Sequence, residues 1–396
     1  LTVAGTACGT AMIEWRSSDG ARRITVAAER QSGTVTADLS VSGTSVASLC
    51  HVPADLTGEL TLVAQLQGRS VLVWHRTGRA TTYVGRLDLA PHLDLRASAE
   101  ARGWTLGLTA RGHTDLRVAC TRFESSLSGN GHADPRIVSY EDGTPIQEGS
   151  TVWFLATTRG GTIPDAFQGV YALDTSTGEM TMTGALFAER DGDGVWHNDN
   201  AGHLFHDRST GAWTWFSVSH SDHPAPRSTY VATSTGDLRH GVNHLPATRV
   251  SMPAEGVLWE DVYPVRDGGR WIATASKNAR HTAWLESTSD ITGPWSETRT
   301  AVGNDETGQL LVRSGSRRYV VSGTTTTAFV VRDADDPAMP ALGHLDLDVD
   351  TGGRRTWPAL FPVQQPGRTR WFMLSFDRTS PAESYSYGRL HLYRQA

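Results

Sequence analysis

Residues 259–276 contain two short apolar runs separated by a turn, Trp259-Glu260-Asp261-Val262-Tyr263-Pro264-Val265-Arg266-Asp267-Gly268 and Arg270-Trp271-Ile272-Ala273-Thr274-Ala275-Ser276. Runs rich in β-branched and aromatic residues on either side of an Asp-Gly turn predict a β-hairpin. Two acidic residues, Glu260 and Asp261, follow Trp259 at the start of the first run. The same pattern recurs along most of the chain.

The recurrence consists of five paired runs between residues 134 and 376. The other four pairs are 134–143 with 152–158, 199–207 with 213–219, 304–312 with 318–323, and 357–363 with 370–376. Radial repetition protects the sheet edges that open β proteins must cover, so five units predict a five-bladed β-propeller. The last unit supplies only a third strand, at 388–393, and residues 116–120 are a candidate for the fourth.

Residues 1–112 show a different pattern, in which strand-like segments and turns alternate about every ten residues. Regular short strands at this spacing predict an antiparallel β-sandwich. The segment has few acidic or histidine clusters, so we expect an accessory role. The prediction is therefore an all-β protein with an N-terminal β-sandwich accessory domain over 1–114, followed by a five-bladed β-propeller catalytic domain over 115–396.

The composition is that of a soluble globular protein: 396 residues, 38% hydrophobic and 20% charged. The net charge of −6 argues against a basic face for nucleic acid. No stretch approaches the ~18 consecutive apolar residues of a membrane span. Since the chain starts at Leu1 without Met, we expect a targeting segment to have been removed and the protein to be secreted, as a monomer.

The three cysteines, Cys8, Cys50 and Cys120, lack the spacing of a zinc site. We therefore predict no metal and no cofactor. Cys8 and Cys50 can form a disulfide in a secreted protein, and buried free thiols are the alternative.

Acidic residues stand near the start of successive units: Asp134, Asp199, Glu260 or Asp261, and Glu306. Inner strands of a propeller start beside its axis, so these side chains are expected to converge. Like charges gathered around one axis raise at least one pKa, which separates acid and base roles. Two carboxyl groups are the minimum for hydrolysis of a glycosidic bond. For any single Asp, local hydrogen bonding in a turn is the alternative interpretation.

Short motifs carry a family resemblance that covers about residues 116–396. Asp134-Pro135, which opens a strand ending at Glu141-Asp142-Gly143, resembles the first blade of the five-bladed glycoside hydrolases. That group includes arabinanases, β-xylosidases and arabinofuranosidases, with the related invertases and fructanases. Asp199 resembles their second-blade Asp, and Trp259-Glu260 their third-blade glutamate. Residues 287–295 are similar to an outer-blade signature of the group.

The resemblance implies one role for each of three acids. Asp134 would be the base of an inverting enzyme or the nucleophile of a retaining one. Asp199 would tune the pKa of its neighbours and orient the sugar, and Glu260 would be the general acid. The resemblance implies a carbohydrate substrate, with furanosidic or xylosidic bonds expected.

The spacing departs from the family pattern in the third unit. Glu260 lies eight residues before the turn glycine Gly268, whereas Asp134 and Glu306 each lie nine before their turn glycines, Gly143 and Gly315. Asp261 and Glu306 are therefore alternative acids, and we expect both to contact substrate if Glu260 is the acid.

Further candidates for substrate binding are polar and aromatic. His197 and Asn198 stand beside the second-unit acid, and His220 follows downstream. Sugars need dense hydrogen-bond donors and acceptors with an aromatic face. Trp259 and Trp357 head inner strands, where stacking on a sugar and packing in the core are both open.

Two other functions compete with hydrolysis. A propeller lyase would use His197 or His220 with Tyr263 as base and acid, and Arg136 or Arg227 would neutralise the carboxylate of a uronate. A non-catalytic carbohydrate-binding propeller is the second alternative. The sugar, the linkage, endo or exo action and the stereochemistry stay open.

Overall fold

The computed structural model describes residues 2–4, 9–51, 56, 58, 60–78, 80–97, 100, 103–112, 117–120, 131–158, 166–220, 227–254, 256–287, 290–301, 305–325, 329–345, 356–377 and 389–395. The chain divides into two compact units, Leu1–Ser128 and Gly129–Ala396, whereas the sequence placed a boundary after residue 114. Within the described residues, no helix combines the length and apolar character needed to cross a membrane.

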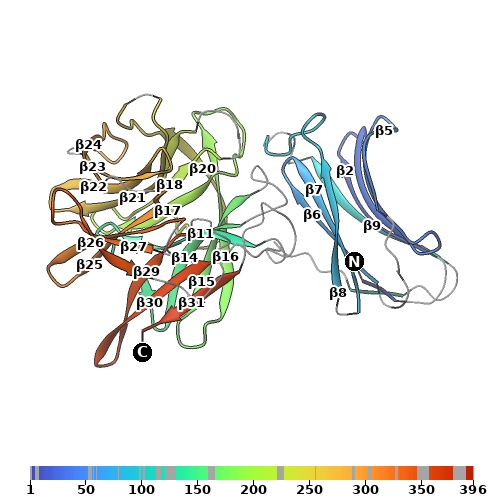
Figure 1. Cartoon of the computed structure of the whole chain (residues 1–396). Coiled ribbons are helices and arrows are strands. Elements are labelled where there is room, and N and C mark those ends of the chain that lie inside the picture. The colour runs from blue at the N-terminus through green and yellow to red at the C-terminus, as the bar shows by residue number, and fades with distance from the viewer. Residues whose placement is uncertain are drawn as a thin grey trace. The chain divides into compact units, whose positions relative to one another are not determined.

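The first unit consists of two five-stranded sheets (Figure 1). Its strands are β1 Thr2–Ala4, β2 Gly9–Ser17, β3 Arg22–Glu29, β4 Thr34–Val41, β5 Thr44–His51, β6 Leu60–Gln67, β7 Ser70–Thr77, β8 Ala80–Asp88, β9 Trp104–Gly112 and β10 Arg117–Cys120. The sheet orders are β5-β4-β3-β2-β9 and β10-β1-β6-β7-β8. Alternate residues of β3, Ile24 and Val26, pack in one core with Leu62 and Val73 from the other sheet, as strand alternation requires.

Strand β10 belongs to the first unit. It pairs antiparallel with β1, and Val118 lies opposite Val3. The prediction that residues 116–120 complete the last unit is therefore wrong for 117–120, because these residues form the edge strand of a sheet in the first unit. Residue 116 lies outside the described residues. Cys50 is an exposed free cysteine, and its candidate partner Cys8 also lies outside the described residues.

The second unit is built from consecutive antiparallel strands, and its described residues contain no helix (Figure 1). The strands are β11 His132–Ile137, β12 Ser139–Tyr140, β13 Gln147–Glu148, β14 Thr151–Thr158, β15 Phe167–Asp174, β16 Met180–Arg190, β17 Asn200–Asp207, β18 Ala212–Val218, β19 Thr229–Ser234, β20 Gly241–Arg249, β21 Trp259–Asp267, β22 Arg270–Lys277, β23 His281–Ser287, β24 Ser296–Ala301, β25 Thr307–Ser314, β26 Arg317–Gly323, β27 Phe329–Asp333, β28 Ala341–Leu345, β29 Ala359–Gln365, β30 Arg368–Phe376 and β31 Leu390–Arg394.

These strands form successive groups along the chain. The groups are β11-β14-β15-β16, β17-β18-β19-β20, β21-β22-β23-β24, β25-β26-β27-β28 and β29-β30-β31. The first two groups join in one sheet, because β16 and β20 pair in parallel. The paired runs of the sequence are the hairpins β11/β14, β17/β18, β21/β22, β25/β26 and β29/β30. The repeat therefore predicted these hairpins correctly.

The first four hairpins share an irregularity near the start of the first strand. The register shifts between Ala133 and Arg136, Asn200 and His203, Glu260 and Tyr263, and Thr307 and Leu310. In each shift one residue adopts a left-handed backbone: Asp134 at φ 55°, Ala201 at 55°, Asp261 at 61° and Gly308 at 66°. We call these four the bulge residues. A β-bulge re-aims side chains next to it, so equivalent positions are defined by the bulge rather than by counting from the turn.

The bulge of the fourth group requires glycine for two reasons: the left-handed backbone of Gly308 and the absence of space for a side chain. A Cβ added to Gly308 would lie 2.4 Å from Cγ of Trp357. We expect Gly308→Ala to lower the free energy of unfolding by about 3 kcal/mol, from left-handed strain and overpacking together. Gly315→Ala is the control, since Gly315 has φ 60° and nothing within 4 Å of its added Cβ. It should cost about 1 kcal/mol. Equal losses in urea denaturation would show that Trp357 exerts no packing constraint.

The first and last groups of the second unit are in contact. Gln147 Nε2 donates a hydrogen bond of 2.8 Å to the carbonyl of Gln364, whose N–H donates one of 2.9 Å to Gln147 Oε1. Ala133 of β11 and Phe376 of β30 pack in one apolar cluster with Trp357. The fifth group of strands, which follows the fourth along the chain, therefore contacts the first group.

Candidate active site

The acidic side chains occupy three different positions relative to the bulges. Asp134 and Asp261 are themselves bulge residues, and Glu260 directly precedes one. Asp199 and Glu306 each lie two residues before a bulge residue, Ala201 and Gly308. The sequence predicted acids at matching positions in successive units. In the structure, Asp134 and Asp261 occupy matching positions at the bulge itself, and Asp199 and Glu306 occupy matching positions two residues before it.

Arg136 connects the first and third groups. Its Nη2 donates a hydrogen bond of 3.3 Å to the carbonyl of Asp261. The guanidinium lies 4.7 Å from the ring centroid of Trp357 and 5.2 Å from that of Tyr263, which are cation–π distances. Burial lowers the pKa of Arg136 to about 10, and the negative charges of Asp261 and Asp134 oppose that shift. Arg136 is therefore a cation at neutral pH.

Asp261 caps the bulge of the following group. Its Oδ2 accepts hydrogen bonds from Thr307 Oγ1 at 2.5 Å and from the N–H of Gly308 at 2.9 Å. The N–H of Ala201, at the equivalent bulge, donates to Thr157 Oγ1 of the preceding group at 3.2 Å. A side chain from the neighbouring group thus satisfies the backbone at both bulges.

The carboxyl of Asp261 is poised between its two protonation states. Burial, with the neighbouring charge of Glu260, raises the pKa of Asp261 to about 7. Hydrogen bonds from Thr307 and Gly308 and the charge of Arg136 act in the opposite direction.

Glu260 lies beside two basic side chains. Its Oε1 contacts Arg227 Nη1 and lies 3.5 Å from His220 Nε2. The N–H of Ser219 donates to the carbonyl of Ser228, and the N–H of Ser228 donates to Ser219 Oγ. These bonds hold the residues next to His220 and Arg227 together. Glu260 is 7% exposed, so its carboxyl has limited contact with water.

Asp199 is a fixed and fully buried carboxylate. Arg190, at the end of β16, binds it in a bidentate manner, with Nε 2.8 Å from Oδ2 and Nη2 on Oδ1. The guanidinium of Arg190 lies 5.3 Å from the ring centroid of Tyr230. Such a fork-to-fork pair fixes orientation as well as charge. Sequence reasoning missed Arg190, because nothing in the residues around it marks it as the partner of an acid nine positions later.

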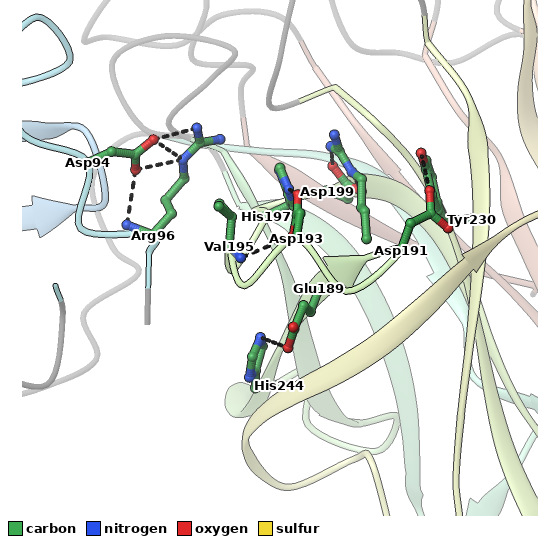
Figure 2. A network of polar contacts seen from close by, with 11 residues as sticks. Asp94, Arg96, Glu189, Asp191, Asp193, Val195, His197, Asp199, Tyr230 and His244 are labelled. Atoms are coloured by element: carbon green, nitrogen blue, oxygen red, sulfur yellow. Dashed lines mark hydrogen bonds and ion pairs between the residues drawn. The ribbon is translucent and has the colours of Figure 1, made fainter. Parts of the chain in front are cut away.

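His197 and Asn198 are buried and hydrogen-bonded to the protein rather than aimed at open space. His197 Nε2 lies 2.6 Å from Asp193 Oδ2, as Figure 2 shows. Asn198 Nδ2 donates a hydrogen bond of 2.5 Å to the carbonyl of Ala166. Their contacts hold the segment that leads into β17, and so they position Asp199.

Glu306 is a member of a buried ion pair. Arg332 donates to both of its oxygens, from Nη2 at 2.5 Å and from Nε at 3.1 Å. Thr282 Oγ1 and Ser322 Oγ donate to Oε2 at 2.6 Å and 2.9 Å. These four hydrogen bonds hold both carboxylate oxygens in place. Sequence reasoning also missed Arg332. Its position directly after the apolar residues Phe329-Val330-Val331, in the same strand-like segment, was a usable signal.

The two tryptophans that head strands are 3% and 4% exposed. Trp259 donates its indole N–H to the carbonyl of Pro253 at 2.7 Å. Arg136 covers Trp357, which also packs against Phe376. Of the two roles considered from the sequence, these contacts support packing rather than stacking on a sugar.

A polar and aromatic layer lies two residues after the bulges. Arg136, His203 and Tyr263 occupy equivalent positions, and Leu310 takes the fourth. The ring centroids of His203 and Tyr263 are 4.3 Å apart, and His203 Nε2 lies 3.3 Å from Ser139 Oγ. Burial holds the pKa of His203 well below its ordinary value. Both rings are therefore neutral at pH 7, and Arg136 is the cation of this layer.

The described residues contain no group of three or more His, Cys, Asp or Glu side chains arranged to hold a metal ion. The chemistry available at the bulges is that of carboxyl groups and arginines.

No family model and no curated protein matches the sequence. Solved structures do match, among them Bacillus subtilis levansucrase, with a TM-score of 0.50, 10% identity, and coverage of 70% of this chain and 88% of that chain. The exo-β-1,3-galactanase 1,3Gal43A from Clostridium thermocellum matches with a TM-score of 0.48 and 12% identity, over 66% of this chain and 62% of that chain. The GH62 α-L-arabinofuranosidase of Coprinopsis cinerea gives 0.46 and 12%, over 69% and 94%. The structural neighbours are thus propeller glycoside hydrolases, the group that the sequence motifs resemble.

Proposed function

We propose that the chain is a glycoside hydrolase whose catalytic domain is a five-bladed β-propeller. The five groups of strands correspond to the blades, and the contact between Gln147 and Gln364 supports closure of the ring. The two sheets of the first unit then form the accessory β-sandwich, which contributes no catalytic group. The chain shares its fold with known glycoside hydrolases, which supports the same class of reaction here.

The observation that carries the proposal is the pair of equivalent bulges joined by Arg136. Arg136 lies two residues after Asp134 and bonds to the carbonyl of Asp261, which supports convergence of Asp134, 8% exposed, with the adjacent acids Glu260 and Asp261. We assign Asp134 as the base or nucleophile and Glu260 as the general acid. The hydrogen bonds of Asp261 to the next bulge support Glu260 over Asp261 as the proton donor.

In the proposed reaction, Glu260 protonates the oxygen of the leaving group while Asp134 activates water or attacks the anomeric carbon. As its proton leaves, the new negative charge on Glu260 is stabilised by Arg227, which already contacts its Oε1. Asp199, held by Arg190, keeps a fixed negative charge near an oxocarbenium-like transition state. We propose furanosidic or xylosidic bonds as the targets.

The lyase alternative finds less support in the same geometry. Its acid, Tyr263, is buried, and burial raises the pKa of that side chain to about 12. The cation suggested for the uronate, Arg136, already contacts two aromatic rings and a carbonyl. These groups therefore have little room to engage a substrate.

The test is a screen of the purified chain on arabinan, xylan, β-1,3-galactan, levan and their oligosaccharides. We expect new reducing ends and smaller products, without the ultraviolet absorbance of an unsaturated uronate. Asp134→Asn is the control that should release nothing above background. An unsaturated product would identify a lyase, and binding without turnover in both proteins would identify a carbohydrate-binding propeller.

A further inference from the structure

Arg136 is a buried cation whose charge is incompletely paired. It is 1% exposed, and its Nη1 has no hydrogen-bond partner among the residues that the structure describes. Its Nη2 donates to a neutral acceptor, the carbonyl of Asp261. A charge in such an environment is costly unless nearby groups of opposite charge compensate it.

The compensation must come from the groups that face Arg136. On its own strand, β11, lies Asp134, and on β21 lie Asp261 and Tyr263. The other groups are the Trp357 ring, the neutral ring of His203, and, acting on Asp261 or Tyr263, Glu260 and Asp142. Carboxyl groups are therefore the only anions that can balance the guanidinium among these facing groups. Glu260 is also paired with Arg227, and Asp134 is taken as the catalytic base or nucleophile. Asp261, whose own carbonyl accepts the hydrogen bond of Arg136, is therefore the carboxyl assigned to it.

We propose that Arg136 is a positioning residue: its guanidinium, held over the rings of Trp357 and Tyr263 and bonded to the carbonyl of Asp261, is the fixed counter-charge of the Asp261 carboxyl beside Glu260. This inference rests on the proposed function, because Glu260 is taken as the proton donor. Asp261 directly follows Glu260 in the chain, so a negative charge on Asp261 acts on the residue taken as the proton donor. Arg136 thus acts on the donor through Asp261 and does not touch the substrate.

The geometry explains why an arginine suits this role. Its planar guanidinium lies over the rings of Trp357 and Tyr263 while still reaching the carbonyl of Asp261. A lysine would keep the charge and lose the fork and the stacking. A glutamine would keep a donor for the carbonyl and lose the charge. These two variants therefore separate charge from packing.

The experiment measures the titration of Asp261 directly, by NMR of protein labelled with 13C at the aspartate carboxyls. Asp261→Asn assigns the signal by its disappearance. In Arg136→Gln we expect the midpoint of Asp261 to rise by about one pH unit or more, because the opposite charge is gone. Arg136→Lys should recover more than half of that shift. Arg136→Met is a second neutral variant, to be used if Arg136→Gln does not fold.

A midpoint within about 0.3 pH units of the original in a folded neutral variant would overturn the inference. The pH profile of kcat/KM supplies a second readout, which should move in Arg136→Gln and stay near that of the unmodified chain in Arg136→Lys. A purely structural role predicts lower activity at every pH with unchanged midpoints. The NMR titration needs no turnover, so an inactive protein would refute the proposed function while still deciding the role of Arg136.

Discussion

Asp134→Asn is expected to lower turnover by about 10²–10⁴-fold, the usual contribution of a catalytic acid or base. The amide keeps the size and the tolerance for a left-handed backbone that the bulge requires, at φ 55°. It removes the negative charge that activates water or attacks the sugar. The measurement is kcat on the best substrate of the screen, with thermal unfolding to confirm that the fold is retained.

Glu260→Gln should show a loss of the same size, because the amide cannot donate a proton to the leaving group. The matched comparison is Asp261→Asn at the next position, which should cause a smaller loss and a changed pH profile. If Glu260→Gln is near full activity while Asp261→Asn is inactive, Asp261 is the acid and the assignment of Glu260 is wrong. If all three variants are active, a carboxylate mechanism is refuted.

Glu306→Gln is expected to lower the free energy of unfolding by about 3–5 kcal/mol, because it leaves Arg332 as a buried charge without its partner. Both oxygens of this carboxylate bind Arg332, and the residue is buried. At temperatures below thermal unfolding of the variant, its kcat should be close to that of the unmodified chain. Urea denaturation and kcat measured on the same sample separate the two effects.

The control is Arg270→Gln, which breaks an ion pair with Glu286 and whose side chain is 49% exposed. Surface pairs contribute about 0–1 kcal/mol, so this variant should be nearly neutral. The double variant Glu306→Met with Arg332→Met should be more stable than Glu306→Gln alone, since no unpaired charge is left. Inactivity of a stable Glu306→Gln would instead make Glu306 a catalytic group.

The hairpins of the second unit were predictable, because their signal is local. Alternating apolar residues around a turn such as Asp267-Gly268 specify two strands without reference to the rest of the chain. The joining of β16 to β20 in parallel has no such signal, since it depends on contacts between residues far apart in the sequence. The placement of β10 failed for the same reason.

The acids were recognisable as a set, and their relative positions were not. Counting from the turn made Glu306 equivalent to Asp134, whereas the bulge places Glu306 two residues before its bulge residue, as it does Asp199. A bulge adds a residue to one strand without changing the apolar pattern that follows, so counting passes over it. The partners Arg190 and Arg332 could not be predicted either, because the sequence does not show which charged residues lie close together in the fold.

The repeated bulge also bears on how such a scaffold changes its chemistry over evolution or in the hands of an engineer. Ala201 adopts φ 55°, the same value as Asp134 and close to the 61° of Asp261. Strand pairing imposes this conformation, so the identity of the side chain is free to vary among residues that tolerate it, Asp and Asn in particular. Moving a carboxyl among the bulge positions 134, 201 and 261 therefore takes a point substitution, with no insertion and no new loop, whereas Trp357 leaves no room for a side chain at Gly308.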